Sequence, residues 1–353
     1  MDQPDIVENH VGPVATKPTD DRAAPTLITS PKESPPKEPL SSARPDSPSA
    51  FAPMGAALAP VLVEVCGRRL TPPRWFRTDW QRGGALTGFS TWTDERGQQH
   101  DTVVKMPVPP VERRWLVDLS SDEITPRVFA HGGELGGYDL AWVVMERLPY
   151  GPIGKKWGAD GIRMLCEAAA AFYTLTSAVP IEPPPPHRDW HAQLKRARDH
   201  VSKTTVRESQ RWRKALKGAS KKLDRWLEVW RAREMTSWRH GDLHLGNAMS
   251  RHAPPNGPAV LIDLPSVGAG HWVEDAVYFE HLYWANPAGL HGHKPAKLIA
   301  RQLHALGLSP GENWPELANI YRALLAMSLP ARLDAEGGGG RALAALGVLE
   351  RYV

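Results

Sequence analysis

The residues best suited to chemistry lie in one short motif, HGDLHLGN at residues 240–247, and in an acidic residue further on, Asp263. The motif holds Asp242 and Asn247 in an Asp-x4-Asn spacing, and Asp263 ends the apolar run Leu261–Ile262. A phosphoryl group in transfer spreads negative charge over its oxygens. One carboxylate must then orient the attacking hydroxyl, while separate oxygen ligands hold Mg²⁺ against the nucleotide phosphates. The pattern therefore predicts a phosphoryl-transfer centre.

Each of the three residues has an expected role in such a centre. Asp242 is the predicted base. The Asp-x4-Asn spacing is that of the protein-kinase catalytic loop, in which the Asn side-chain carbonyl reaches a magnesium ion. Asn247 and Asp263 are therefore predicted magnesium ligands. Taken singly, each could instead be a turn residue or a strand-end cap, but their order favours the catalytic interpretation.

These residues resemble those of the aminoglycoside phosphotransferase and choline kinase family. Gly241 stands where protein kinases usually carry Arg, and residues 270–276 (GHWVEDA) are similar to the family's Gly-x-x-x-x-Asp-Leu-Ala segment. The resemblance extends over roughly residues 75–330. It implies a protein-kinase-like fold, the use of ATP and Mg²⁺, and a structural role for Asp275 in the second lobe. Family members phosphorylate aminoglycosides, choline, amino sugars, homoserine and other hydroxyl compounds, so the acceptor stays open.

A lysine and a glutamate in the first half of the chain are candidates for binding the nucleotide phosphates. Lys105 ends the apolar pair Val103–Val104, and Glu112 lies on the helix expected to follow. In kinases such a glutamate pairs with the lysine and fixes it. Since a spacing of seven residues is short, Glu123 is the alternative partner. A lysine on an edge strand is also often merely solvated.

Two further segments are candidates for binding the nucleotide. The glycine-rich run 83–88 (GGALTG), with Gly84 and Gly88, could lie over the phosphates with its N–H groups facing them. An ordinary glycine turn explains it nearly as well. The segment 145–148 (MERL) resembles the family hinge, in which backbone groups of Glu146 and Leu148 would bind the adenine edge. The alternative is a plain strand exit.

The elements expected around these residues divide the chain into a β-rich part and a helical part. Short β-branched or alternating runs predict strands at 61–65, 89–93, 102–106 and 140–145, with a turn at 94–97 and a helix at about 110–119. Helices are expected from Asp160 as N-cap, over the basic stretch 190–233, and from a capping box at Asn313 and Glu316. The proline run 183–186 breaks the chain, and glycines 337–340 form a hinge.

Composition limits the remaining possibilities. Residues 1–58 form an expected disordered, proline-rich tail, because the stretch 17–48 carries too few apolar side chains to offset its ordering entropy. With two distant cysteines, no run of eighteen apolar residues and no apolar segment at the N-terminus, a cytoplasmic protein without a membrane partner is expected. A net charge of +4 is too small to indicate a nucleic-acid partner.

Three side-chain groups invite a functional interpretation that we do not favour. His291 and His293 lack further ligands at a useful spacing and are assigned to a surface loop. His244 is assigned at most a supporting role next to the motif. The basic residues between Lys195 and Arg225 are interpreted as a solvated helix face, the alternative being an acceptor pocket for an anionic substrate.

The sequence thus predicts an α+β, bilobal, protein-kinase-like fold, with a nucleotide-binding lobe over 59–148 and a helical lobe over 149–353. The expected function is transfer of the γ-phosphoryl group of ATP–Mg to the hydroxyl of a small molecule. The alternatives are a non-catalytic binding protein on the same fold and, more weakly, a protein kinase. The sequence leaves open the oligomeric state and the choice between ATP and GTP.

Overall fold

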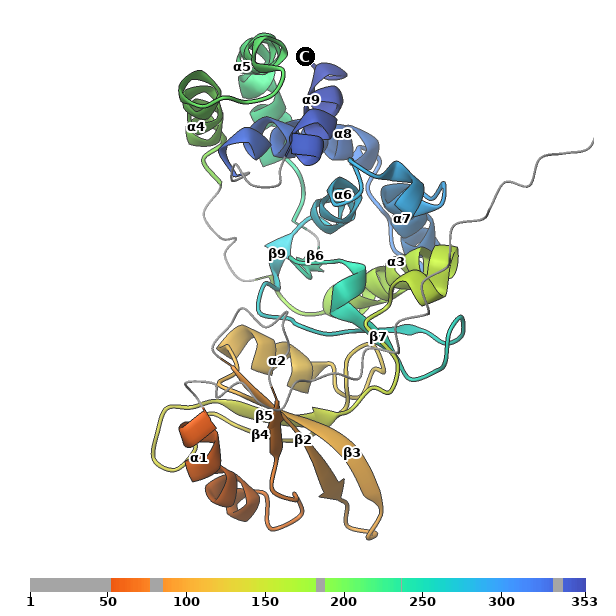
Figure 1. Ribbon diagram of the computed structural model, residues 1–353. Helices are drawn as coiled ribbons and strands as arrows, with labels where there is room; N and C mark the ends of the chain where they lie inside the picture. Colours follow the sequence, from red (N-terminus) through yellow and green to blue (C-terminus); the bar gives the residue numbers. More distant parts are fainter. Residues whose placement is uncertain (1–51, 77–84, 182–187, 236, 333–338) are drawn as a thin grey trace, which may run out of the picture. The chain divides into compact units, whose positions relative to one another are not determined.

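The computed structural model describes residues 52–76, 85–181, 188–235, 237–332 and 339–353 (Figure 1). All of them belong to the second of two compact units, Ala43–Val353. The expected tail therefore lies outside the described residues as far as residue 51, as do the proline run 183–186 and the first half of the glycine hinge, residues 337–338. No helix in the described ranges has the length and apolar character needed to cross a membrane.

A twisted antiparallel sheet forms the first part of the described chain. Its five strands within the described residues follow the order β1-β2-β3-β5-β4. Their bounds are β1 (Arg74–Phe76), β2 (Leu86–Thr93), β3 (Gln99–Met106), β4 (Val128–Gly132) and β5 (Trp142–Glu146). Side chains alternate between the two faces of a strand. Val104 and Val144 therefore lie on one face, and their neighbours Lys105 and Val143, which pair in register, lie on the other.

Helices cover both faces of this sheet (Figure 1). α1 (Ala52–Val65) packs Leu58 and Leu62 against Val104 and Val144. On the opposite face, α2 (Pro110–Asp118) packs Trp115 into the same core as Val143. The face that carries Lys105 is therefore the face that α2 covers.

The prediction of a strand at 61–65 is wrong, and so is the prediction that the tail extends to residue 58. Residues 52–65 form the helix α1. Val61, Val63 and Val65 have high β-propensity, but the segment before them is rich in alanine, and Leu58 and Leu62 stand four residues apart on the face that meets the sheet. Packing of that helical stripe outweighs the local preference.

The second part of the chain is mainly helical and carries two short two-stranded ribbons, β6–β9 and β7–β8. The strands are β6 (Ser237–Arg239), β7 (Ala248–Ser250), β8 (Ala259–Leu261) and β9 (Gly268–Gly270). The helices are α3 (Gly158–Thr176), α4 (Trp190–Lys203), α5 (Ser209–Arg231), α6 (Val273–His281), α7 (Pro295–Ala305), α8 (Trp314–Ser328) and α9 (Gly339–Glu350). Short 3-10 helices occupy Lys155–Trp157, Leu245–Asn247, Pro287–Leu290 and Leu329–Ala331. The mixed α+β composition is as predicted.

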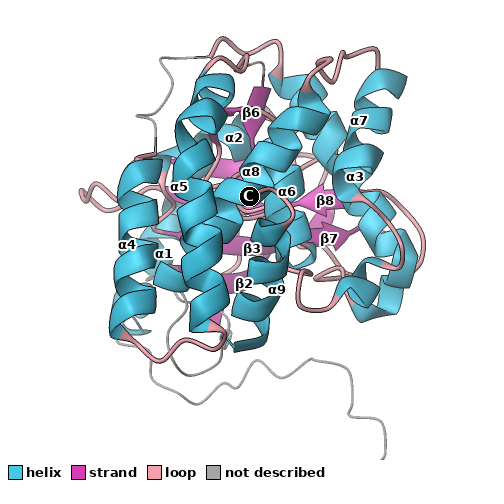
Figure 2. Ribbon diagram, turned by 90° about the horizontal axis from the view of Figure 1, so that it is seen from above, coloured by secondary structure: helices cyan, strands magenta, loops and turns pink. Residues whose placement is uncertain are grey.

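Some helix boundaries differ from expectation. The basic stretch 190–233 forms two helices, α4 and α5, which pack against each other and against α8 (Figure 2). Asp160 lies in the first turn of α3 and pairs with Arg163 instead of capping the helix. α8 begins after Asn313 as predicted, but the Asn313 side chain makes no capping hydrogen bond. Pro315, the second residue of α8, lacks one of the two N–H groups that such a cap can bind.

Candidate active site

Lys105 and Glu112 meet on the covered face of the sheet. The Lys105 ammonium donates to both oxygens of Glu112, at 2.6 and 2.8 Å. The spacing of seven residues suffices because α2 begins shortly after β3 and places Glu112 in its first turn. Glu112 is 2% exposed, and this burial raises the pKa of its carboxyl, against the opposing influence of Lys105. The alternative partner, Glu123, accepts from Arg251 through its backbone carbonyl, and its side chain makes no ion pair with Lys105.

The β7–β8 ribbon brings Asn247 next to the segment that carries Asp263. Asn247 immediately precedes β7, Asp263 follows β8, and the Ile262 N–H donates to the Asn247 carbonyl at 3.0 Å. Asp263 has φ +63°, a left-handed conformation that Asp tolerates better than most residues. Its Oδ1 lies 3.3 Å from Lys105 Nζ. The lysine therefore connects Glu112 on α2 with the carboxylate after β8.

Hydrogen-bond donors surround the Asp242 carboxylate. The Tyr278 hydroxyl donates to Oδ1 at 2.6 Å, Asn247 Nδ2 donates to Oδ2 at 3.0 Å, and His244 Nε2 lies 3.6 Å from Oδ2. The interactions with His244, Tyr278 and Asn247 lower the pKa of Asp242 to about 2, although its partial burial acts in the opposite direction. Asp242 is thus ionised at neutral pH. His244, which we assigned at most a supporting role, lies beside this carboxylate.

The orientation of the Asn247 amide follows from the same contacts. Its Nδ2 donates to both the carbonyl and the carboxylate of Asp242. The amide oxygen Oδ1 is consequently the atom left to accept or coordinate.

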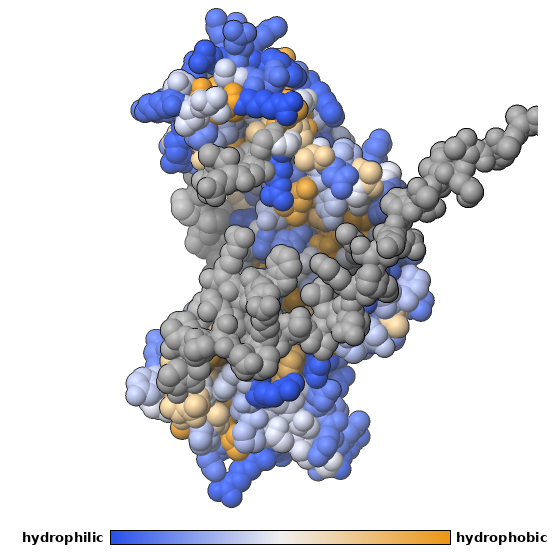
Figure 3. Space-filling view, viewed as in Figure 1, coloured by the Kyte–Doolittle hydropathy of each residue, from blue (hydrophilic) through white to orange (hydrophobic). Residues whose placement is uncertain are grey.

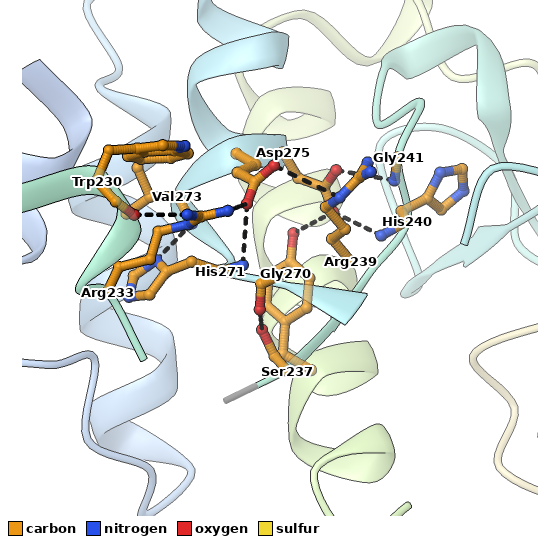
Figure 4. A network of polar contacts seen from close by, with 12 residues as sticks. Trp230, Arg233, Ser237, Arg239, His240, Gly241, Gly270, His271, Val273 and Asp275 are labelled. Carbon is orange, nitrogen blue, oxygen red and sulfur yellow. Dashed lines mark hydrogen bonds and ion pairs between the residues drawn. The ribbon is translucent and has the colours of Figure 1, made fainter. Parts of the chain in front are cut away.

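A buried carboxylate, Asp275 of α6, holds the backbone just before Asp242 (Figure 4). Asp275 Oδ2 accepts from the His240 N–H at 2.6 Å and from the Tyr173 hydroxyl at 2.9 Å, and Oδ1 accepts from the Gly241 N–H at 2.9 Å. None of these hydrogen bonds involves Asp242. These contacts give Asp275 a positioning role.

Gly241 and His240 fix the rest of this turn. Gly241 has φ +84°, and a Cβ at this residue would lie 2.1 Å from the Ser266 carbonyl oxygen, so only glycine fits. His240 is fully buried; its Nε2 lies 3.2 Å from the Ile262 carbonyl, and its Nδ1 accepts from the Asp242 N–H. Burial lowers the pKa of His240, so the ring is neutral with its proton on Nε2.

The hinge candidates Glu146 and Leu148 lie at and after the end of β5. The Glu146 N–H is bound to the Arg127 carbonyl at 2.7 Å, whereas the Leu148 N–H has no partner in the ranges that the structure describes. The Glu146 side chain is ion-paired to Arg251 at 2.7 Å. Although its partial burial acts in the opposite direction, the Arg251 hydrogen bonds lower the pKa of Glu146.

The glycine-rich segment differs from its expected form. Gly84 lies outside the described residues. Gly88 is not in a loop but inside β2, where a Cβ would lie 2.8 Å from the Trp75 ring. The missing side chain at Gly88 makes room for Trp75, and this packing explains the glycine without a phosphate.

The structure adds two residues that the sequence analysis missed. Tyr278 follows Asp275 by three positions on α6, so a helix through Asp275 places both on neighbouring faces. Arg251 follows β7 and binds the carbonyls of Glu123 and Thr125 as well as Glu146. The Asp275 assignment offered a signal for Tyr278, but no local pattern pointed to Arg251.

In the described part of the chain, Asp242 makes no hydrogen bond or ion pair with the basic stretch 190–233 or with the histidine pair. α5 buries an apolar stripe that includes Trp212, Leu223 and Trp230. Its cations are exposed, as are those of α4, and the surface over both helices is largely hydrophilic (Figure 3). The histidines of 291–293 belong to a loop, and no cluster of potential metal-binding side chains occurs in the described part of the chain.

Comparison with known proteins places these features in a family context. The model of the phosphotransferase enzyme family matches residues 84–320. A candidate aminoglycoside phosphotransferase from Ralstonia eutropha JMP134 is 13% identical, covers 83% of this chain and 98% of its own, and has a TM-score of 0.52. An aminoglycoside phosphotransferase from Alicyclobacillus acidocaldarius is 14% identical, covers 80% and 89%, and has a TM-score of 0.54. These structures confirm the predicted kinase-like fold. No curated protein matches the sequence.

Proposed function

Because the chain belongs to the phosphotransferase enzyme family, we propose that it is a small-molecule kinase that transfers the γ-phosphoryl group of ATP–Mg to an acceptor hydroxyl. The observation that carries the proposal is the position of Lys105, which contacts Glu112 at 2.6 Å and Asp263 at 3.3 Å. A lysine fixed by a buried glutamate and facing a second carboxylate is the arrangement that kinases use to hold phosphates beside magnesium.

Nucleotide binding is assigned to residues on both sides of Lys105. Its ammonium would contact the phosphates, and Glu112 holds it in place. The Leu148 N–H, which has no partner among the described residues, and the backbone carbonyl of Glu146 are the groups proposed for the adenine edge. The Glu146 side chain, paired with Arg251, fixes the strand end that presents them.

Asn247 and Asp263 are the residues proposed to hold Mg²⁺. The donor set fits a hard cation, since the Asn247 amide presents its oxygen and Asp263 contributes a carboxylate that is about half exposed. Two protein oxygens are enough because Mg²⁺ usually takes its other ligands from phosphates and water. When bound, the ion would neutralise charge on the nucleotide phosphates.

Asp242 is proposed to orient the acceptor hydroxyl. A carboxylate with a pKa near 2 is a weak base, so its main contribution is to hold the hydroxyl in line for attack. In a loose phosphoryl-transfer transition state the hydroxyl proton becomes acidic only as the new bond forms, and a weak base can then accept it. Tyr278 and Asn247 keep the carboxylate in one orientation.

The test is a thermal-shift titration with ATP and Mg²⁺, followed by ATP turnover with a panel of hydroxyl compounds. The parent should be stabilised by ATP more strongly with Mg²⁺ than without, and Asp242→Asn should retain this binding while losing phosphate transfer. Equal stabilisation with and without Mg²⁺ would contradict the magnesium assignment. Binding without turnover of any acceptor would favour a non-catalytic protein on this fold.

A further inference from the structure

Arg239 lies at the end of β6, three residues before Asp242. Its side chain crosses the β6–β9 ribbon over Gly270, where a Cβ would lie 2.7 Å from Arg239 Cδ. It shares the carboxylate of Glu274 with Arg233, at 3.6 and 3.1 Å. Two guanidinium groups therefore depend on one carboxylate.

The two arginines are not equivalent. Arg233 is buried, donates to the Trp230 carbonyl and lies 4.0 Å from the centre of the Trp230 ring (Figure 4). Arg239 is 27% exposed at its side chain, and its guanidinium makes no hydrogen bond with any residue that the structure describes. Arg233 thus fixes Glu274, whereas Arg239 has donors available for a ligand.

A second arginine is placed close to Arg239. Arg188 lies 4.8 Å over the Trp190 ring, and the neighbouring Asp189 is engaged as the N-cap of α4. Although Arg188 as a whole residue is exposed, burial of its guanidinium and the positive charges of Arg196 and Arg239 lower its pKa. Within the described ranges Arg188 forms no ion pair with a carboxylate.

Tyr321 of α8 joins the two arginines. Its ring stacks on Trp230 at 4.8 Å and meets the edge of Trp190 at 6.2 Å. It interacts electrostatically with Glu274, Arg239 and Arg188, in decreasing order, and its hydroxyl has no hydrogen-bond partner in the described part of the chain. Two guanidinium groups and a phenol hydroxyl are therefore near one another, and apart from the 3.6 Å ion pair of Arg239 with Glu274 none of them is bound to an acceptor among the described residues.

Helix α6 contacts both this group of donors and the proposed reaction centre. Glu274 binds Arg239 near its start, and Tyr278, four residues later, binds Asp242. Residues four apart lie on one helix face with a rise of about 6 Å. The three Cα–Cα steps from Arg239 to Asp242 span at most about 10 Å. Arg239 and Asp242 are therefore close enough for one small molecule to contact both.

We propose that Arg239, Arg188 and the Tyr321 hydroxyl form an oxyanion-binding subsite for the acceptor, so that the molecule phosphorylated beside Asp242 carries a carboxylate or a phosphate group. The proposal rests on the proposed function and narrows its substrate class. Guanidinium groups bind both anions through short, charge-assisted hydrogen bonds. A polycationic acceptor such as an aminoglycoside would be repelled there.

The experiment measures thermal stability in saturating ADP–Mg, and the arginine variants identify the site at which an added anion binds. Sodium malonate and inorganic phosphate are titrated separately, each against sodium chloride of equal ionic strength. The variants are Arg239→Gln and Arg188→Gln. Arg198→Gln is the matched control, because Arg198 is an exposed α4 arginine two positions from Arg196 and so points away from it.

The parent and Arg198→Gln should show a saturable rise in Tm of about 3–10 °C with at least one anion. Each subsite variant should need about tenfold more anion or more for the same rise. A response to malonate alone indicates a carboxylate acceptor, and a response to phosphate alone indicates a phosphorylated one. A parent without a rise beyond that in chloride, or an unchanged response in Arg239→Gln, would overturn the subsite. Failure of ADP–Mg itself to stabilise the parent would count against the proposed kinase function and leave the anion result standing.

Discussion

Replacing Asp275 by asparagine should destabilise the protein and displace the loop that carries Asp242. The carboxylate accepts three hydrogen bonds, from the His240 and Gly241 N–H groups and from the Tyr173 hydroxyl, and is 1% exposed. An amide has only one accepting atom, so one of its ends must face a backbone N–H with a donor. Losing one charge-assisted bond and creating a donor–donor contact costs about 2–4 kcal/mol. For a chain of this size, the expected fall in Tm is about 5–10 °C.

The assay combines urea unfolding with phosphate transfer, and Tyr173→Phe is the matched control. The control removes one neutral donor from the same carboxylate and leaves both backbone bonds, so it should cost about 1 kcal/mol. Asp275→Asn should lose stability and kcat together, because the displaced backbone moves Asp242. An asparagine variant as stable as the parent but inactive would refute the positioning role and place Asp275 in the chemistry instead.

Three further predictions concern the centre and the pH dependence of the fold. Asp242→Asn should lower kcat by about a hundredfold or more, the scale of general-base loss, with the nucleotide Kd unchanged in a binding titration. Asp263→Ala and Asn247→Ala should both weaken Mg²⁺-dependent ATP binding in calorimetry, Asp263→Ala more, because it removes the charged ligand. Burial, with Arg233 nearby, lowers the pKa of His271 to about 4. The folded state therefore binds this proton less readily than the unfolded chain, and stability falls as the pH drops from about 6.5 towards 4, by about 3 kcal/mol; urea unfolding should show a smaller fall for His271→Gln.

The parts of the fold and of the centre that could be predicted depend on local pattern. The HGDLHLGN motif carries Asp242 and Asn247 within one turn, so spacing alone brings them together. Alternation along β3 puts Lys105 on the face opposite Val104, and a helix starting directly afterwards returns Glu112 to that face. In each case the contact joins residues close in sequence.

The parts that escaped prediction depend on contacts between distant segments. α1 is a helix because Leu58 and Leu62 meet the sheet, a partner that its own sequence does not reveal. Gly88 is explained by the Trp75 ring across the strand pair. Arg188 and Tyr321 are near each other although they are more than a hundred residues apart in sequence. The many other basic residues of α4 and α5 concealed Arg188 as the arginine of the proposed oxyanion subsite. Propensity and spacing carry no information on such pairs.

One face of α6 contacts both the oxyanion subsite and the loop that carries Asp242. Glu274 binds Arg239, Asp275 binds the backbone before Asp242, and Tyr278 binds the Asp242 carboxylate itself. Since a helix fixes the rise between its residues, the distance between the oxyanion subsite and the oriented hydroxyl is set by one rigid element. Asp242 is a weak base, so the rate must come mainly from this alignment. An acceptor whose anion and hydroxyl match one helical turn would therefore gain in kcat, whereas a shorter or longer homologue would bind its anion and leave its hydroxyl misplaced.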